Sequence, residues 1–290
     1  MAKAGCGRIV VDVARRGYRR HSGGGGIMAD QNTPAHQSRV LYKFISLHSE
    51  FGRPAFEEAL LRNRLWWSNP NSFNDPFDCK PSLNYDLSPL RRSSFARHAA
   101  RNVLPNQSRA TQRRAAKFGA AKPPKLVTKQ LKETFERWID ESAVACFTRT
   151  RDNMLLWSHY ADKHQGVCLT FVELLDIHNL ALDVTYSRTR PLIRMGDKSA
   201  GREVLPALLT KADFWRYEHE ARMIDWKFPA GYRDFPAPSL IGLTLGARIS
   251  AADQKYVADI VLKSRRSIII ERAELASHEY RLKFVPWTLS

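Results

Sequence analysis

Short runs of β-branched and aromatic residues alternate irregularly with helical patterns, and this arrangement most constrains the fold. Runs typical of strands lie at 40–45, 65–68, 143–148, 166–171, 181–187, 220–226, 240–245, 267–272 and 281–285. Patterns typical of helices lie at 55–61, 88–138, 152–160, 200–213 and 251–262. Because no strict strand–helix–strand rhythm links these elements, they favour an α+β fold. We predict a single α+β domain with a mixed or antiparallel sheet over residues 28–290.

Positive charge is concentrated in one segment of the chain. Of the 46 Lys and Arg residues, 13 lie between residues 91 and 138, where only Glu133 and Glu136 are acidic. Prolines divide this stretch, so we predict a helical basic insertion at about 88–138. Its helices are either simply solvated or contact the phosphates of a nucleic acid. The candidate nucleic-acid-binding residues are Arg91, Arg92, Arg97, Arg101, Arg113, Arg114 and Lys117.

The first 27 residues are rich in arginine and end in a glycine run directly before Met28. We expect a disordered extension or a mis-called start, with Met28 as the true first residue. No apolar run reaches the roughly 20 residues of a membrane span, and no apolar stretch typical of a secretion signal follows the N-terminal arginines. Together with four cysteines that form no Cys-x-x-Cys pair, this predicts a cytoplasmic protein without a membrane partner.

Common catalytic motifs are absent from the sequence. It contains no glycine-rich dinucleotide or phosphate loop, no His-Glu-x-x-His and no Gly-x-Ser-x-Gly. His159 and His164 are five residues apart, a poor helical spacing for sharing one metal ion. We therefore predict no metal site and no bound cofactor.

Two polar segments remain as candidate pocket walls. The loop at 67–78 is rich in Asn, Asp and Pro, and is either a rigid corner or a wall formed by Trp67, Asn74, Asp75 and Asp78. The second segment, at 157–166, follows a short helix that we expect Asp152 to cap. It contributes Trp157 to the pocket, and its candidate catalytic residues are His159 and Tyr160, although a core role is an equal alternative for His159.

A third segment combines two acids with a guanidinium group. If Glu218, Glu220 and Arg222 lie on one strand, they share a face because the side-chain period is two. They are either a solvated strand face or a buried ion pair that fixes the fold. The functional alternative is a carboxylate, oriented by the neighbouring candidate Arg222, that binds a sugar hydroxyl or stabilises a cationic transition state. Which acid faces a cleft depends on strand register.

One ordered series of motifs runs from about residue 40 to residue 287. It comprises Leu-Tyr-Lys-Phe at 41–44, Leu-Trp-Trp-Ser-Asn-Pro at 65–70, Phe-Asn-Asp-Pro-Phe-Asp at 73–78, Cys-Phe-Thr at 146–148, Trp-Ser-His-Tyr-Ala at 157–161, Gly-Val-Cys-Leu at 166–169, Tyr186, then Trp215, Tyr217, Glu218, Glu220 and Arg222, and Leu-Gly-Ala-Arg at 245–248. This series resembles the bacterial domain-of-unknown-function 2971 family. The basic insertion departs from the pattern. The resemblance implies kinship and leaves the activity open.

The order of the polar candidates is similar to that in ADP-ribosyltransferases, where two splayed sheets flank a cleft. A polar group on the first strand, an aromatic or hydroxyl group midway and a late glutamate correspond here to Tyr42 or Lys43, His159 or Tyr160, and Glu218 or Glu220. The similarity implies an enzyme that uses NAD as a substrate in a phage-defence or toxin setting. The alternative is a non-catalytic module that binds nucleic acid through residues 91–138, and the sequence does not identify a protein partner.

Overall fold

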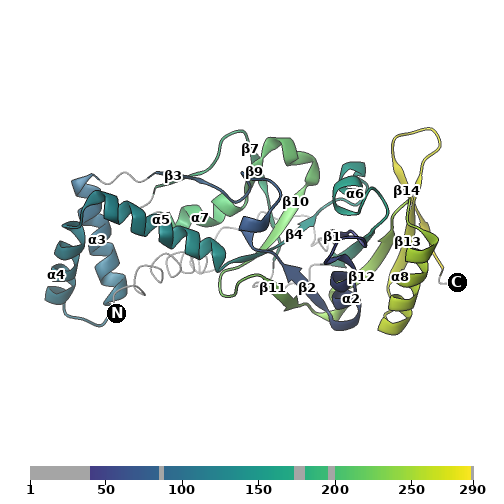
Figure 1. The fold of residues 1–290 in the computed structure, drawn as a ribbon, viewed down its shortest axis with the longest axis horizontal. Helices are drawn as coiled ribbons and strands as arrows, with labels where there is room; N and C mark the ends of the chain where they lie inside the picture. Colours follow the sequence, from purple (N-terminus) through teal and green to yellow (C-terminus); the bar gives the residue numbers. More distant parts are fainter. Residues whose placement is uncertain (1–39, 85–87, 173–179, 195–199, 289–290) are drawn as a thin grey trace, which may run out of the picture.

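The computed structural model describes residues 40–84, 88–172, 180–194 and 200–288; the predicted extension at 1–27 and Met28 lie outside them. A mixed eight-stranded sheet forms the centre, and all its neighbouring strands are antiparallel except for one parallel pair, β12 and β13 (Figure 1). The strands follow one another across the sheet as β14 (Leu282–Pro286), β13 (Ile269–Leu275), β12 (Leu240–Leu245), β5 (Val167–Val172), β1 (Val40–Ile45), β4 (Ala143–Thr148), β10 (Glu220–Asp225) and β6 (Leu182–Asp183). The predicted α+β class is confirmed.

Strand β1 shows how the sequence covers both faces of the sheet. Side chains alternate between the two faces of a strand. Leu41 and Ile45 are buried in the main hydrophobic core, whereas Tyr42 and Phe44 pack against a smaller core. The strand therefore needs apolar cover on both sides.

Helices α2 (Gly52–Arg62) and α8 (Ala251–Ser264) cover the main core. They bury Phe56 and Leu60 from α2, and Val257 and Val261 from α8. These residues recur at three- to four-residue spacing, so each helix presents one apolar stripe to the sheet. The predicted helix at 251–262 is confirmed and extends to Ser264.

Helix α6 (Met154–Tyr160) belongs to the smaller core through Trp157, which is fully buried. The helix begins at Asn153, whose side chain accepts a hydrogen bond from the Leu155 backbone N–H at 2.8 Å. The predicted cap, Asp152, is therefore wrong by one residue. The boundary is set by the side chain that accepts from the second helical N–H, which is that of Asn153.

The loop after α6 has an unusual backbone. Asp162, Lys163 and His164 all have left-handed φ angles, of 47°, 54° and 71°. Non-glycine residues seldom adopt this conformation, and such strain persists only where the surroundings enforce it. The Arg248 backbone N–H holds the loop by donating to the His164 carbonyl oxygen at 2.9 Å, and Gly246 permits this close approach because a Cβ there would lie 2.1 Å from that oxygen. The loop and the segment after β12 thus lock together beside α6.

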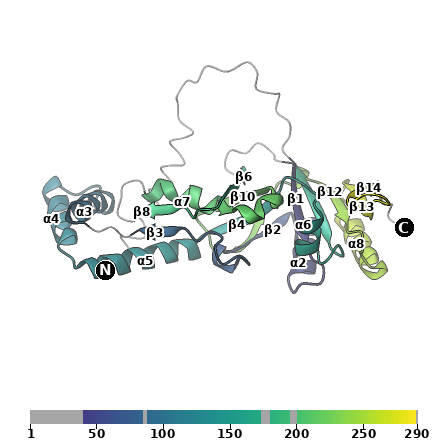
Figure 2. The same ribbon diagram turned by 90° about the horizontal axis from the view of Figure 1, so that it is seen from above.

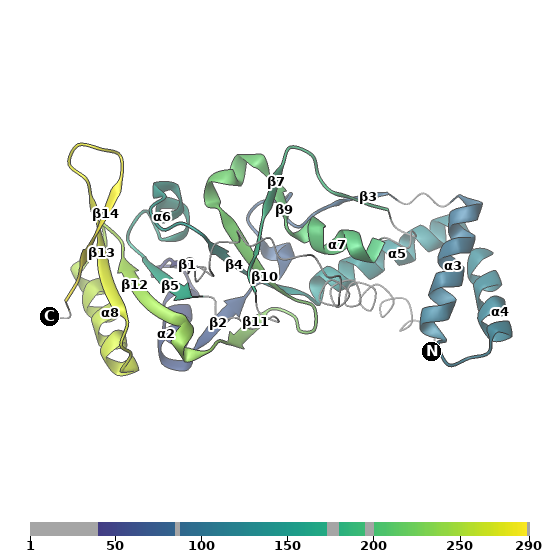
Figure 3. The same cartoon turned by 180° about the vertical axis from the view of Figure 1, so that it is seen from behind.

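The predicted insertion forms three helices, α3 (Pro89–Val103), α4 (Arg109–Ala120) and α5 (Pro124–Asp140). Figures 1 and 3 show α3 and α4 at the end of the molecule opposite α8, and from above α5 runs back toward the sheet (Figure 2). Leu131, Phe135 and Trp138 of α5 are buried in a second core with Leu208 of helix α7 (Ala200–Leu208). The insertion is therefore anchored by its third helix.

Besides the central sheet, the described residues form three two-stranded sheets, and the sequence predictions missed most of their strands. They pair β2 (Arg64–Trp67) with β11 (Gly231–Asp234), β3 (Ser82–Asn84) with β8 (Leu192–Arg194), and β7 (Thr185–Ser187) with β9 (Thr210–Ala212). The predicted strand at 181–187 is split between β6 and β7. The predicted helix at 200–213 ends at Leu208, and β9 and the 3-10 helix η2 (Asp213–Glu218) follow it. Short 3-10 helices also occupy Pro70–Ser72 and Ala237–Ser239.

In the part of the chain that the structure describes, no helix has both the length and the apolar character required to cross a bilayer.

Candidate functional site

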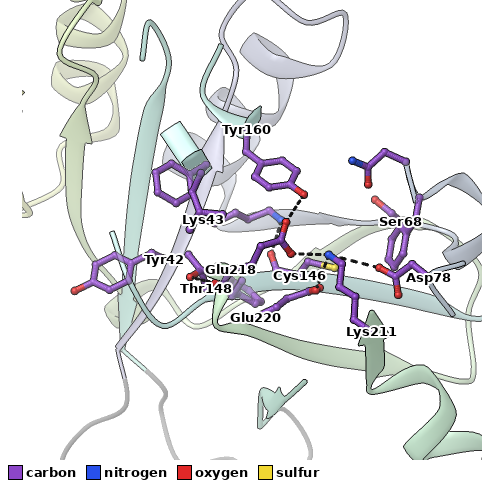
Figure 4. Close-up of a pocket in the computed structure, with 15 residues that line it drawn as sticks. Tyr42, Lys43, Ser68, Asp78, Cys146, Thr148, Tyr160, Lys211, Glu218 and Glu220 are labelled. Atoms are coloured by element: carbon purple, nitrogen blue, oxygen red, sulfur yellow. Dashed lines mark hydrogen bonds and ion pairs between the residues drawn. The ribbon is translucent and has the colours of Figure 1, made fainter. Parts of the chain in front are cut away.

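A cavity lies where strands β1 and β4 part. β1 pairs with β5 along its whole length, but with β4 only through Tyr42 and Thr148. Further along, β4 pairs with Ser68, which exchanges two backbone hydrogen bonds with Val144 at 2.8 and 2.9 Å. The resulting fork holds a cavity of about 230 Å³ (Figure 4). Its lining residues are Tyr42, Lys43, Phe44, Ser68, Phe73, Asn74, Asp78, Cys146, Phe147, Thr148, Leu156, Tyr160, Lys211, Glu218 and Glu220.

Glu218 presents a carboxylate to this cavity and is fixed at both oxygens. The Tyr160 hydroxyl donates to Oε1 at 2.7 Å, and the Lys211 ammonium donates to Oε2 at 2.5 Å. Burial, reinforced by the charge of Glu218, raises the pKa of Tyr160, so the phenol keeps its proton. The cavity therefore contains a positioned acceptor beside a positioned donor.

Lys211 is the cationic centre of the site. Its Nζ lies 2.5 Å from Glu218, 3.1 Å from Glu220 and 3.7 Å from Asp78. Burial favours the neutral amine, but the carboxylates of Glu220 and Glu218 outweigh burial and raise the pKa of Lys211. Lys211 is therefore an ammonium at neutral pH.

Arg222 lies beneath the cavity and does not line it. Its side chain is fully buried, and all five N–H donors have partners. The guanidinium donates to Glu220 at 2.7 and 2.9 Å, to Asp78 at 2.7 Å, to the Leu208 carbonyl at 2.7 Å and to Cys79 Sγ at 3.2 Å. Arg222 therefore positions the acids from below and is not available to a ligand.

Glu220 is the more constrained of the two glutamates. Burial opposes its ionisation, but Arg222 and then Lys211 outweigh burial and hold the pKa of Glu220 at about 2. The Tyr186 hydroxyl accepts a hydrogen bond from the Glu220 backbone N–H at 2.8 Å. Glu220 is thus a fixed anion that completes the floor of the cavity.

Glu218, Glu220 and Arg222 do not all lie on one strand, so the condition under which the three would share a face is not met. Glu218 ends the 3-10 helix η2, and His219 follows it with a left-handed φ of 44°. Only Glu220 and Arg222 share a face of β10. The turn at His219 nevertheless returns Glu218 to the same cavity, so both acids line it.

Lys43 reaches into the fork from β1. Its Nζ donates to the Cys146 carbonyl oxygen at 3.0 Å and lies 5.4 Å from the centre of the Phe147 ring. That carbonyl belongs to the part of β4 that β1 no longer pairs with. Burial lowers the pKa of Lys43, against the opposing effects of Cys146 and Glu220. Lys43 and Tyr42, both predicted from the first strand, thus line the cavity.

The loop at 67–78 both forms a fixed turn and contributes residues to the lining of the cavity. Asn74 and Asp78 line the cavity, as predicted. The Asp78 Oδ1 atom is buried and has no hydrogen-bond partner in the described structure. Asp75 instead accepts a hydrogen bond from the Phe77 backbone N–H at 2.8 Å and fixes the turn. Trp67 is buried in the main core, so Asp75 and Trp67 do not line the cavity.

Of the three candidates on helix α6, one lies at the cavity. Tyr160 lines the cavity. Trp157 is a core residue whose Nε1 donates to the Arg151 carbonyl at 2.7 Å. His159 is exposed and does not line the cavity, so neither a core position nor a position in this cavity applies to it. His159 and Tyr160 are consecutive in the sequence, and the helical rotation of about 100° per residue places them on different faces.

Sequence reasoning missed Lys211, Thr148 and Cys146 as site residues. Thr148 donates to the Glu218 backbone carbonyl at 2.5 Å and so fixes the chain beside the acid. Burial raises the pKa of the Cys146 thiol well above its ordinary value, so the sulfur stays protonated. Cys146 and Thr148 could have been found from the motif Cys-Phe-Thr at 146–148, whereas no sequence motif marks Lys211.

The predicted nucleic-acid-binding residues lie together on the three-helix insertion. Arg91, Arg97 and Arg101 of α3, and Arg113, Arg114 and Lys117 of α4, are exposed. Arg92 is only partly exposed and donates to the Lys122 carbonyl at 3.4 Å. The ion pairs that the structure gives within the insertion join Lys129 to Glu133 and Lys132 to Glu136, both on α5. The insertion therefore presents a cationic surface that is remote from the cavity.

Among the described residues, no three His, Cys, Asp or Glu side chains are grouped as metal ligands. Lys211 and Arg222 occupy the space between the clustered acids. Family models, curated proteins and solved structures give no match to this chain.

Proposed function

We propose that the cavity binds the nicotinamide–ribose end of NAD and cleaves the bond between them, as in ADP-ribosyl transfer. The observation that carries this proposal is the Glu218 carboxylate, fixed by Tyr160 and Lys211 within a partly apolar cavity. A carboxylate held in this way stabilises positive charge that develops nearby, without reorganising during the reaction.

The proposed reaction breaks the bond from ribose C1′ to the nicotinamide nitrogen. Both bonding electrons leave with nicotinamide, which departs as a neutral molecule, and C1′ becomes cationic. Glu218 accepts hydrogen bonds from the ribose hydroxyls and lowers the energy of this cation. The oxygen of water, or of an acceptor hydroxyl, then bonds to C1′ and releases its proton to solvent.

The walls of the cavity suit the leaving group. Phe44 and Phe73 provide apolar surface for a planar ring. The unpartnered Asp78 Oδ1 provides an acceptor for a carboxamide N–H. The volume of about 230 Å³ is below the roughly 300–1,000 Å³ of sites that enclose a whole ligand. Only the nicotinamide–ribose end therefore enters, and the adenine end lies outside.

Nicotinamide release from NAD tests this function directly. We expect Glu218→Gln to lower the release rate by about 100-fold or more, because it removes the charge that stabilises the cation. Glu274→Gln, on the exposed surface of β13, is the matched control and should retain the wild-type rate. A folded Glu218→Gln protein with an unchanged rate, or a wild-type protein that releases no nicotinamide, would refute the proposal.

A second candidate function, nucleic-acid binding, is favoured by the exposed cations of α3 and α4. Each lost phosphate contact reduces the slope of log affinity against log salt by about one. We expect the double variant Arg113→Glu/Arg114→Glu to weaken retention on duplex DNA and to reduce that slope by about two. Lys255→Glu/Lys263→Glu on α8 makes the same change in charge at the opposite end of the molecule and is the control. Equal losses in both variants would contradict a binding surface on the insertion.

A further inference from the structure

Two lysines line the same cavity in opposite environments. Lys211 has three carboxylate groups within 4 Å of its Nζ. Lys43 has no ion pair with any described residue, and its one hydrogen-bond acceptor is the neutral Cys146 carbonyl. Titratable groups that share a site but have opposing environments commonly take different chemical roles.

The surroundings of Lys43 favour an unprotonated amine. Burial lowers the pKa of Lys43, and only Cys146 and Glu220 oppose that effect. The Cys146 thiol is itself kept neutral by burial, which raises its pKa, so it supplies no counter-charge. Glu220 is already neutralised by Arg222 and Lys211, through contacts of 2.7 to 3.1 Å. Lys43 therefore places an amine without a paired carboxylate in a cavity that also contains a protonated phenol and an ammonium.

We propose that Lys43 Nζ is a nucleophile that forms an imine with a small hydroxylated aldehyde or ketone. The nitrogen adds to the carbonyl carbon, and the carbonyl oxygen takes up the two amine protons and leaves as water. No oxidant, reductant or metal is required. The reaction does not depend on NAD cleavage, although ring-opened ribose belongs to this class of substrate.

The cavity provides the contacts that such a substrate needs. Glu218 and Asp78 present carboxylate oxygens that accept hydrogen bonds from hydroxyl groups, and the Asp78 Oδ1 atom has no partner in the described structure. Tyr160 lines the same cavity, and its hydroxyl holds the Glu218 carboxylate in place at 2.7 Å. The small volume favours short-chain sugars over larger carbonyl compounds.

Reductive trapping with glyceraldehyde tests the proposal on the full chain. The protein is incubated with glyceraldehyde and sodium cyanoborohydride at pH 7, and labelled lysines are mapped by peptide mass spectrometry. An exposed lysine of ordinary pKa has only about one neutral amine in 2,500 at this pH, and each unit by which its pKa falls increases that fraction about tenfold. We expect Lys43 to be labelled at least about tenfold faster than the exposed Lys255 and Lys263.

The controls separate nucleophilicity from general exposure. Lys43→Met should lose only the fast label, while the labelling of Lys255 and Lys263 stays unchanged. The rate at Lys43 should also level off at a lower pH than the rates at those surface lysines. Labelling of Lys43 no faster than that of Lys255 overturns the proposal. No NAD is present, so the result is independent of whether nicotinamide is released.

Discussion

Removal of the Arg222 guanidinium tests whether the buried charge cluster organises this part of the fold. Arg222→Leu keeps an apolar side chain beneath the cavity but removes five hydrogen bonds and leaves Glu220 and Asp78 poorly compensated. Breaking a buried ion pair from one side costs about 3–5 kcal/mol. Independently, the fall in the pKa of Glu220 from its ordinary 4.5 to about 2 corresponds to about 3 kcal/mol of stabilisation. We expect Arg222→Leu to lower the free energy of unfolding at pH 7 by about 3–5 kcal/mol.

The pH dependence of this loss distinguishes electrostatics from packing. The folded-state pKa of Glu220 is depressed, so its stabilisation is complete above pH 4.5 and decreases as the pH falls toward 2. If Glu220 in the variant titrates near its ordinary value, the gap in the free energy of unfolding between wild type and Arg222→Leu is smaller at pH 4 than at pH 7, by about 1 kcal/mol. Urea unfolding followed by tryptophan fluorescence measures both quantities. Arg188→Leu is the control, because Arg188 pairs with Asp213 at 3.0 Å but is 90% exposed and should contribute less than about 1 kcal/mol. Two results would refute an electrostatic role for Arg222. One is a fall in the free energy of unfolding of less than about 1 kcal/mol for Arg222→Leu at pH 7. The other is a gap between variant and wild type that stays the same at pH 4.

Two further predictions concern the loop beside α6. The side chain of His48 contacts Asp162 at 2.5 Å and Asp253 at 3.0 Å, and the hydrogen bond with Asp162 raises the pKa of His48 against partial burial. The stabilisation by protonated His48 is therefore complete below about pH 6.5 and is lost as the pH rises through the folded-state pKa. The melting temperatures of His48→Gln and wild type should differ more at pH 6 than at pH 9. An equal difference at the two pH values would contradict this prediction. Gly246→Ala places a Cβ against the His164 carbonyl, and we expect it to lower the free energy of unfolding by about 1–3 kcal/mol or more. Thermal unfolding measures this loss. An unchanged melting temperature would show that the loop can shift without cost and would contradict the prediction.

The central strands could be predicted from the sequence because their pattern matches their burial. The run at 143–147 is apolar and forms most of a central strand, and the run at 40–45 alternates between two cores. The short strands β3, β8 and β11 have three or four residues each, too few for their patterns to be distinguished from those of a loop. Their existence depends on pairing with distant segments.

The site was partly predictable for the same reason. Lys43, Tyr160, Glu218 and Glu220 belong to recognisable motifs, and the structure brings them together. Lys211 could not be found, because its position requires the helix to end at Leu208 and a three-residue strand to follow. Nothing local in the sequence marks that change.

The fork between β1 and β4 has a consequence for how the molecule opens. A single paired position, Tyr42 with Thr148, joins the part of the sheet that ends in β14 to the part that ends in β6. The two parts still share the main hydrophobic core, so the weak point is confined to the fork. Amide hydrogens of β1 and β4 that point into the fork should exchange faster than those in the continuous β1–β5 and β4–β10 ladders. A ligand in the cavity contacts residues of both strands, so its binding would slow exchange on both sides of the fork.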